Sequence, residues 1–449
     1  MNFEDFEINS KAKAALVSIV CDKIEGHKTE PETHHSASEL KELLRTLDID
    51  HEGFYFQKKE SPDAGTVLGK GKLLDIAEQA RKSNCDTLVF DFELSGSQVR
   101  NIKKLTKLEV VDRISIILEI FAQHAKTRDS KIQIEILRLE YLLPRLSTLW
   151  THFSRQKGGI GLRGGEGEQQ IELDRRMIRE RVAVLKKELQ EIQKSRSEQK
   201  KKRSNQAVTA ALVGYTNAGK STLMNKLCRV DVLAEDKLFA TLDSTFRMLN
   251  PDTKPPMILV DTVGFISNLP STLVNGFKTT LESALEADLL ITVCDISDPF
   301  FEKHLEVTQN VLNELGVKDK PRLIVFNKRD KLENSYEALI KARKYPNHFI
   351  ISAQNADEID DLRDSIVNYF LDLQGEYELF VPYERGEIHS KIIGKTNVIS
   401  TNHHEEGTFY KIKIPSFLFN SLGLSDFITS PKTEKRQKIK LVKTSKKII

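Results

Sequence analysis

Hydrophobic and polar positions follow two different rhythms in the first half of the chain. In residues 1–112, apolar runs rich in β-branched and aromatic residues, such as AALVSIV and DTLVFDF, alternate with helical patterns such as KLLDIAEQARKS. This alternation predicts a small N-terminal α/β domain. In residues 113–204, apolar side chains recur at spacings of three and four, for example between Ile171 and Leu189, and this periodicity predicts a helical linker.

The pattern changes again in the second half. From 205 to 372, near-continuous apolar strands such as AVTAALV, LLITVCDI and RLIVFN are separated by helical patterns. Strands of this kind predict a mostly parallel sheet with helices on both faces, and therefore an α/β domain. Residues 373–449 contain the strand patterns ELFVPY and GTFYKIKIP, which predict a small C-terminal α+β module followed by a basic tail.

A glycine-rich stretch interrupts the helical linker. Six of the ten residues from Gly158 to Gly167 are glycine, which is too many for a helix or a strand. We therefore expect a loop between the arms of a long helical hairpin. The loop either carries contacts or serves as the connector of the hairpin, and both interpretations stay open.

Composition places the chain among globular proteins of about three domains. Of its 449 residues 39% are hydrophobic and 30% charged. The four cysteines are scattered without a disulfide or zinc pattern, which suits a reducing compartment. The N-terminus is polar and acidic, and no apolar run approaches the roughly 20 residues of a membrane span. We expect a cytoplasmic protein with no membrane partner.

The net charge of +3 does not mark a nucleic-acid binder, but basic residues gather in two places. QKSRSEQKKKRS precedes residue 205, and TEKRQKIKLVKTSKK lies in the tail. Both stretches could neutralise phosphates. A solvated linker face and a disordered tail are equally open alternatives.

The stretch GYTNAGKS, residues 214–221, follows a predicted strand and precedes the helical pattern STLMNKL. Its glycines permit a tight turn whose backbone N–H groups, together with the helix dipole, favour an anion. Lys220 is placed to reach the β- and γ-phosphates of a nucleotide, and the Ser221 hydroxyl to ligate Mg²⁺. The predicted nucleotide-binding residues of this turn are Gly214, Tyr215, Thr216, Asn217, Ala218, Gly219, Lys220, Ser221 and Thr222.

Further motifs lie at the exits of later strands. In DTVG, Asp261 is placed to hold a Mg²⁺-bound water, and the Gly264 backbone N–H to approach the γ-phosphate. In NKRD, Asp330 can accept two hydrogen bonds from guanine where adenine offers neither, so the expected ligand is GTP or GDP. In ISAQN, a backbone N–H could reach the guanine O6. The binding residues predicted from these motifs are Asp261, Thr262, Val263, Gly264, Asn327, Lys328, Arg329, Asp330, Ser352 and Ala353.

The connection LFATLDSTFR lies between the first two motifs and is predicted to be a switch segment. Thr241 is the expected second Mg²⁺ hydroxyl and γ-phosphate contact, and Thr245 is the alternative. The segment adds Phe239, Ala240, Thr241, Leu242 and Asp243 to the predicted binding residues. The predicted metal ligands are Ser221, Thr241 and Asp261, and the predicted catalytic residues are Lys220, Thr241 and Gly264.

Phe265 follows DTVG, where many regulatory GTPases carry a glutamine that orients the attacking water. A phenyl ring neither accepts nor donates that hydrogen bond, so we expect slow hydrolysis by the chain alone. Another group or a partner would have to position the water, or the ring would have to move. The amide oxygen of Asn217 is a candidate ligand for K⁺ beside the phosphates.

The set GYTNAGKS, FATLD, DTVG, NKRD and SA resembles the translation-factor-like P-loop GTPases. Outside these motifs the chain resembles the HflX family, from about residue 65 through the GTPase domain. The stretches that carry this resemblance are ELSGSQVRNIKKL, VVDRISIILEIFAQHA, WTHFSRQKGGIGLRG and DRRMIRERV. Where that family usually reads GPGETQLETD, this chain has GGEGEQQIELD. A hydrophobic residue after DTVG belongs to the family pattern.

The resemblance implies a GTPase that binds the large (50S) ribosomal subunit and dissociates stalled or idle 70S ribosomes, with hydrolysis stimulated by ribosomes. It implies a monomer when the protein is off the ribosome. Contacts with rRNA are expected through phosphates and 2′-hydroxyls. The basic residues in and after the glycine-rich loop that could make them are Arg155, Lys157, Arg163, Arg175 and Arg176.

Two other functions use the same motifs. A large-subunit assembly factor would bind the subunit without splitting ribosomes, and the sequence does not separate it from a splitting factor. A P-loop kinase of a small metabolite is disfavoured by Asn327 and Asp330, because such a kinase would more often use ATP.

Overall fold

The computed structural model describes residues 12–146, 166–204, 207–230, 238–239, 241–250, 253–267, 273, 286–317, 320–332 and 336–430. The chain forms two compact units. The first comprises Met1–Ile192, Glu235–Asp243 and Ile266–Lys278. The second comprises Gln193–Ala234, Ser244–Phe265 and Thr279–Ile449. The division into four domains at residues 112, 204 and 372 stays a prediction.

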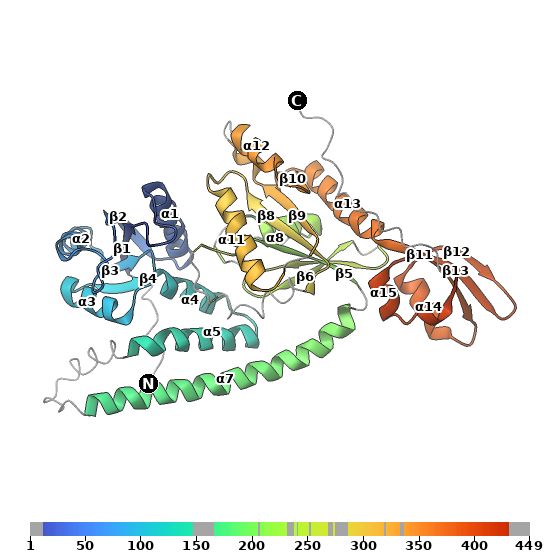
Figure 1. Ribbon diagram of the computed structural model, residues 1–449, viewed down its shortest axis with the longest axis horizontal. Helices are drawn as coiled ribbons and strands as arrows, with labels where there is room; N and C mark the ends of the chain where they lie inside the picture. Colours follow the sequence, from blue (N-terminus) through green and yellow to red (C-terminus); the bar gives the residue numbers. More distant parts are fainter. Residues whose placement is uncertain are drawn as a thin grey trace. The chain divides into compact units, whose positions relative to one another are not determined.

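The first unit begins with a four-stranded parallel sheet in the order β2-β1-β3-β4. Its strands are β1 (Lys13–Val20), β2 (Asp50–Lys58), β3 (Thr87–Phe90) and β4 (Glu109–Asp112), joined by helices α1 (Glu30–Thr46), α2 (Lys70–Lys82) and α3 (Gly96–Thr106). Apolar side chains such as Val17 and Phe90 pack with Ile76 of α2 in the core. Figure 1 shows the strands among these helices, as the alternating pattern predicts.

Capping residues fix where α1 and α3 begin. Thr29 accepts a hydrogen bond from the backbone of Glu32 at the start of α1, and a proline occupies the first turn. At α3, Ser95 and Gln98 form a reciprocal capping box. Strand β4 is short and reads EVVD, so its two apolar residues are too few for a search for apolar runs to find it.

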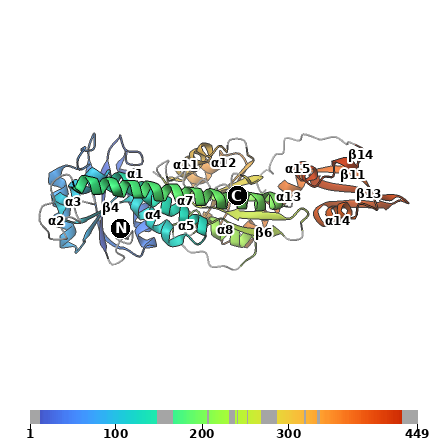
Figure 2. The same ribbon diagram turned by 90° about the horizontal axis from the view of Figure 1, so that it is seen from below.

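The helical part consists of α4 (Arg113–His124), α5 (Arg128–Leu142), the 3₁₀ turn η2 (Leu143–Arg145) and α7 (Glu166–Ser204). Ile132 and Ile136 of α5 pack against Ile178 and Leu185 of α7. The two helices run side by side in both views (Figures 1 and 2). The spacing of these apolar residues explains the helix pair, because three- and four-residue steps place them on one stripe.

The second unit contains a six-stranded sheet in the order β10-β9-β8-β5-β7-β6. Its strands are β5 (Val208–Gly214), β6 (Thr245–Asn250), β7 (Met257–Asp261), β8 (Leu289–Asp295), β9 (Arg322–Asn327) and β10 (His348–Ile350). All neighbours pair in parallel except the edge strand β6, which is antiparallel to β7. This confirms the expected mostly parallel sheet.

Helices surround that sheet and supply its core. They are α8 (Lys220–Leu227), α11 (Phe301–Glu314), α12 (Tyr336–Arg343) and α13 (Ala356–Asp372), with the 3₁₀ turn η3 (Arg329–Lys331). Leu223 of α8 and Leu362 of α13 join Leu212 and Leu259 of the strands in one buried cluster. Because β5, β7, β8 and β9 are mostly apolar, most of their polar side chains lie where the strands end, and this is where chemistry can be placed.

The chain ends, among the described residues, in an α+β module whose antiparallel sheet has the order β12-β13-β11-β14. Its elements in chain order are β11 (Gln374–Pro382), α14 (Gly386–Lys395), β12 (Asn397–His403), β13 (Gly407–Pro415), α15 (Ser416–Ser421), η4 (Ser425–Phe427) and β14 (Ile428–Ser430). Tyr410 and Ile412 of β13 are buried, whereas Phe409 and Lys411 point to the other face. The module confirms the predicted C-terminal α+β class.

Candidate nucleotide-binding site

The glycine-rich turn leaves β5 and leads into α8 with a backbone that its glycines require. Gly214 has φ +146°, and a Cβ there would collide with the carbonyl oxygen of Val293. Gly219 has φ +89°, and a Cβ there would collide with the side-chain amide of Asn327. Side chains are excluded at both positions, so the backbone of the turn can approach Val293 and Asn327 closely before it enters the N-terminus of α8.

Lys220 is the first residue of α8, and its side chain is 6% exposed. Its ammonium donates hydrogen bonds to the carbonyl oxygens of Gly214 at 3.2 Å and Tyr215 at 2.7 Å. Burial lowers the pKa of Lys220 to about 8, while the charge of Asp261 opposes that shift. A buried cation that is held by carbonyls gains from anionic oxygens, so the surroundings of Lys220 favour a phosphate ligand.

Ser221 and Asp261 bring two oxygen donors together below the turn. The Ser221 hydroxyl donates to Asp261 Oδ2 at 2.6 Å, and Asp261 is 1% exposed. Hydroxyl, carboxylate and phosphate oxygens are the hard ligands that Mg²⁺ prefers, so this donor set fits that ion. Thr241, the third predicted ligand, belongs to the first compact unit.

The DTVG segment is tied to the glycine-rich turn by its backbone. Phe265 N–H donates to Gly214 O at 3.0 Å, and Thr216 N–H donates to Phe265 O. The hydroxyl of Thr262 donates to Leu212 O at 2.6 Å, which anchors the segment to β5. A Cβ on Gly264 would lie 2.9 Å from Lys220 Nζ, so the absence of a side chain keeps the backbone of Gly264 beside the lysine.

The NKRD and ISAQN loops meet at the exit of β9. Asn327 donates from its side chain to Ala218 O at 3.0 Å and accepts from Ala353 N–H at 3.0 Å. Ser352 donates from its hydroxyl to Asp330 Oδ1 at 2.5 Å. One asparagine therefore connects the glycine-rich turn to both later motifs, although these are far apart in sequence.

Two acidic residues that the sequence analysis did not select form hydrogen bonds or ion pairs with these loops. Asp295, at the end of β8, forms an ion pair with Lys328 Nζ at 2.8 Å. Glu358 of α13 pairs with Arg329 and accepts from Ser352 N–H at 2.7 Å. Asp295 is the last residue of the otherwise mostly apolar strand LLITVCD, so its place at a strand end was a usable signal, whereas nothing near Glu358 in sequence marks it.

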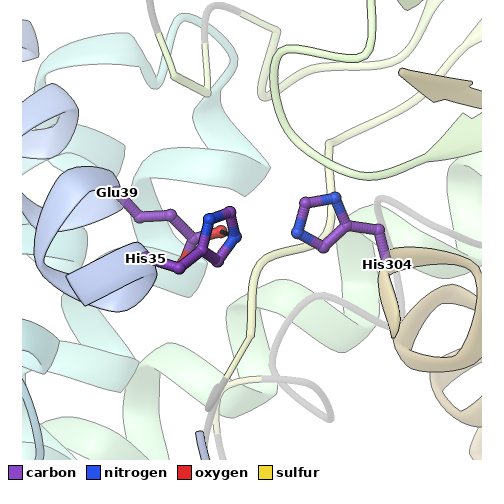
Figure 3. A group of neighbouring side chains, drawn as sticks. All are labelled: His35, Glu39 and His304. Atoms are coloured by element: carbon purple, nitrogen blue, oxygen red, sulfur yellow. Dashed lines mark ion pairs between the residues drawn. The ribbon is translucent and has the colours of Figure 1, made fainter. Parts of the chain in front are cut away.

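Aromatic stacking adds a further contact. The ring of Tyr215 stacks on His304 of α11 with centroids 3.7 Å apart and an interplanar angle of 9°. Figure 3 includes this histidine. The contact holds the beginning of the glycine-rich turn against α11, and it depends on packing that no motif records.

Asn217 lies at the tip of the turn with φ +55°. Lys328 Nζ lies 3.5 Å from its amide oxygen. The atom selected as a K⁺ ligand therefore already faces an ammonium group, and its binding of K⁺ stays a prediction.

The switch segment contacts helices of the first unit. The buried ring of Phe239 packs against Phe121 of α4, with centroids 4.6 Å apart. Asp243 accepts hydrogen bonds from the backbone N–H groups of Lys126 and Thr127, both at 3.1 Å. It also accepts from the Thr127 hydroxyl at 2.7 Å and from the Ser130 hydroxyl.

Asp243 therefore binds the residues at the start of α5, whose N-cap is Thr127, and a negative charge is favourable near a helix N-terminus. Burial acts to raise the pKa of Asp243, but the hydrogen bonds from Ser130 and Thr127 outweigh it and lower that pKa. Contact of Phe239, Leu242 and Asp243 with the nucleotide stays a prediction. Ala240 lies outside the described residues.

Of the basic residues expected to meet RNA, two lie on α7. Arg176 pairs with Glu180 at 2.8 Å, and Arg175 lies 3.6 Å from Glu172. Arg155, Lys157 and Arg163 lie outside the described residues. Within the described ranges, no helix combines the length and the apolar character needed to cross a membrane.

A glycine-rich strand-to-helix turn with a buried lysine, a Ser–Asp oxygen pair and an NKRD loop bonded to that turn defines a P-loop GTPase. Comparison with known proteins gives the same class. Residues 209–328 match the family described as 50S ribosome-binding GTPase. Residues 34–122 and 124–203 match the families described as the N-terminal and middle regions of a GTP-binding GTPase.

The GTPase HflX of Akkermansia muciniphila is 39% identical over 434 residues, which cover 93% of this chain and 98% of that relative. The GTPase HflX of Escherichia coli is 36% identical over 365 residues, covering 81% and 85%. A GTP-binding protein of Sulfolobus solfataricus, solved in complex with GDP, is 28% identical and covers 80% of this chain and 98% of its own, with a TM-score of 0.42. The chain belongs to the HflX family of GTPases, and it binds and hydrolyses GTP.

Proposed function

We propose that this GTPase binds the 50S ribosomal subunit and uses GTP to dissociate stalled or idle 70S ribosomes into subunits. The match of residues 209–328 to a ribosome-binding GTPase family supports the partner. The observation that carries the proposed mechanism is the attachment of Asp243 to the start of α5, because it joins the switch segment to the helical linker.

Nucleotide binding in this proposal uses the residues described above. Ser221, Thr241 and Asp261 would hold Mg²⁺, which supplies positive charge to the β- and γ-phosphate oxygens of GTP. Lys220 exchanges its carbonyl partners for phosphate oxygens and balances their charge. The backbone N–H of Gly264 donates to the γ-phosphate, and Asp330 accepts from the guanine base.

Hydrolysis in the isolated protein is proposed to be slow. The backbone N–H and C=O of Phe265 are both hydrogen-bonded to the glycine-rich turn, and its side chain is 3% exposed. A buried phenyl ring held in this way cannot orient water, so a ribosomal group would have to complete the site. K⁺ near Asn217 is a further proposed source of positive charge.

Coupling to the ribosome follows from the switch segment. Thr241 lies two residues before Asp243, so movement of Thr241 toward a γ-phosphate would also displace Asp243, which is bonded to the N-cap residue Thr127 of α5. Loss of the γ-phosphate would reverse that movement. The GTP-dependent change would thus reach the linker, whose bases Arg155, Lys157, Arg163, Arg175 and Arg176 are the proposed rRNA contacts. A monomeric, cytoplasmic protein is part of the proposal.

Sucrose-gradient sedimentation of 70S ribosomes with the protein and a non-hydrolysable GTP analogue tests the function. Conversion to free subunits is the expected result. Cosedimentation with 50S subunits without conversion would favour a large-subunit assembly factor, and the absence of cosedimentation would contradict both functions.

Ser130→Ala tests the coupling step. The variant removes one hydrogen bond to a charged carboxylate, which contributes about 1.5–3 kcal/mol. We expect about a tenfold fall in splitting, with GTP affinity changed less than about twofold. Ser38→Ala is the matched control, because that exposed hydroxyl donates to its own helix at His34 O. Unchanged splitting by Ser130→Ala would remove Asp243 from the mechanism.

A further inference from the structure

The helices α4 and α5 enclose a cavity that lies apart from the predicted GTP-binding residues. The two helices form a hairpin through residues 125–127, and Figure 1 shows them next to each other. The cavity has a volume of about 380 Å³ and is lined only by residues of the first unit. Cavities of roughly 300–1,000 Å³ are typical of sites for small organic ligands. The size of this cavity therefore suits a small molecule.

The middle of the cavity is apolar. Leu118 of α4 and Ile134 and Leu139 of α5 line it, and each of these side chains is 3% exposed. Ala122 lies one turn after Leu118 on α4, and its single methyl group leaves the space beside it open. Apolar walls of this kind favour an apolar occupant, which gains contacts that water does not supply.

The charged residues that line the cavity leave one positive charge without a counter-charge. Glu119 of α4 pairs with Arg138 of α5, and Glu135 pairs with Arg181 of α7 at 2.8 Å. Lys131, near the start of α5, is exposed and has no ion-pair partner in the part of the chain that the structure describes. The excess charge favours an anionic group at this end of the cavity.

The opposite end of the cavity carries hydroxyl groups whose protons are already in use. The Tyr141 hydroxyl donates to Asp112 Oδ1 at 2.6 Å, and the Ser115 hydroxyl donates to the same oxygen at 2.9 Å. Burial raises the pKa of Tyr141, so its hydroxyl keeps the proton that it donates. Because these groups have no proton left for an anion, the charged end of a ligand belongs at Lys131. Its apolar part then extends toward Tyr141, about 15 Å further along α5.

We propose that the cavity between α4 and α5 binds a small amphipathic anion, with its apolar chain between Leu118 and Ile134 and its anionic group beside Lys131. A nucleotide would bring several phosphate charges to a site with a single uncompensated cation. A protein helix is about 10–12 Å across, which is too wide for a cavity of about 380 Å³. The apolar walls and the lone ammonium together fit one apolar chain with one negative charge.

The inference goes beyond the proposed ribosome function, and its test needs neither ribosomes nor GTP. Titration calorimetry of the full-length chain is carried out with decanoate below its micelle concentration. Decylammonium, which has the same chain length and the opposite charge, is measured in parallel. We expect saturable binding of one decanoate per chain and about fivefold weaker binding of decylammonium, because Lys131 attracts one head group and repels the other.

The variant Lys131→Gln tests the charged end of the site. It should weaken decanoate binding about twofold to fivefold, the usual range for an exposed ion pair, and should remove the preference over decylammonium. Lys131→Arg keeps the positive charge and should stay close to the wild type. Lys104→Gln is the matched control, since it neutralises an exposed lysine on α3 that does not line the cavity.

The variant Ala122→Leu tests the apolar part. A larger side chain at this position occupies the space of the ligand chain, so decanoate binding should weaken about tenfold or more. Gln123→Leu is the control, because it adds a side chain of the same size at the next, exposed position of α4, outside the lining. Hydrogen exchange of the α4 and α5 amides establishes that the helices are folded in each variant.

Three results would overturn the proposal. The first is the absence of saturable decanoate binding to the wild type. The second is equal decanoate affinity of Ala122→Leu and the wild type. The third is equal affinity of the wild type for decanoate and decylammonium, because the alkyl chain alone would then direct binding. If Ala122→Leu fails to fold, the Lys131→Gln titration decides, since that change affects only an exposed side chain.

Discussion

The carboxyl ends of the two parallel sheets differ in what surrounds their charged side chains. In the second unit, Lys220 and Asp261 stand beside a turn in which Gly214 and Gly219 exclude side chains. In the first unit, the corresponding edge is filled by a buried charge cluster of His27, Glu39, Asp91 and Arg113. In this sheet the chain runs from β1 to β2 toward one edge and from β3 to β4 toward the other. The point between the adjacent strands β1 and β3, where the strand order reverses, is where ligands often bind in such folds.

The buried charge cluster satisfies its own charges. Arg113 donates to Asp91 Oδ1 at 2.8 Å and to Glu39 Oε2 at 2.7 Å, and His27 Nε2 lies 3.0 Å from Asp91 Oδ2. Glu39 and His35 project from neighbouring turns of α1, as Figure 3 shows. Similar sheets thus use strand ends in two ways: a turn built of backbone N–H groups receives phosphate, whereas a cluster of paired side chains stabilises the sheet.

Asp91→Asn should have the largest effect and should fall on stability. The change leaves the guanidinium of Arg113 buried without its full counter-charge, which costs about 3–5 kcal/mol. Hydrogen exchange of the β1 and β3 amides reports the free energy of unfolding of this sheet. Glu30→Gln, in the exposed pair with His34, is the control and should cost less than about 1 kcal/mol.

The same variant has a predicted pH dependence. Burial acts to raise the pKa of Asp91, but the hydrogen bond with His27 and the charge of Arg113 lower it. A lowered pKa contributes stability that is present above the unfolded value of about 3.9 and is lost as pH falls through the folded value. The difference between wild type and variant should therefore shrink only in strong acid. If the buried charge cluster bound GTP, the Asp91→Asn variant would have a lower GTP affinity than the wild type at neutral pH. That result would contradict the contrast between a stabilising cluster and a nucleotide-binding turn.

Asp330→Asn should have the next largest effect and should fall on ligand choice. Loss of the carboxylate removes the acceptor for two guanine N–H groups, so GTP affinity should fall about tenfold to a hundredfold. Affinity for xanthosine triphosphate should rise, because its base offers the complementary pattern. Calorimetry with both nucleotides measures the exchange.

Asp364→Asn is the control for this change, since that exposed aspartate lies on α13 outside the pocket. Unfolding of the first unit should be the same in both variants. GTP affinity that survives Asp330→Asn would contradict the assignment of the base pocket.

Exchange of K⁺ for Na⁺ at the proposed site beside Asn217 should have the smallest effect, and it should fall on the rate of GTP turnover. If its amide oxygen contributes to a K⁺ site, turnover in K⁺ buffer should exceed turnover in Na⁺ buffer a few-fold, on the order of the gain from one added positive charge. Asn217→Ala should make the two rates equal. Equal rates in the wild type would show that the ammonium of Lys328, 3.5 Å from that oxygen, leaves no role for the ion.

The second unit was the easier part to predict because its motifs are local. GYTNAGKS, DTVG and NKRD begin at the last residues of β5, β7 and β9, and parallel strands bring their ends to one edge. The α/β class and the mostly parallel sheet followed from the same apolar runs. The edge strand β6 and the short β4 were missed, since TFRMLN and EVVD lack a continuous apolar pattern.

The sequence by itself determined the glycine-rich turn, the guanine motif and the family, because each depends on residues a few positions apart whose backbone chemistry is local. Tertiary structure decided which partner each charged group receives. Asp243 meets Thr127, His27 meets Asp91, and Phe380 meets Phe409, although many residues separate the members of each pair. Such contacts arise when distant segments pack on one core, and no pattern of neighbouring residues encodes the distance between them.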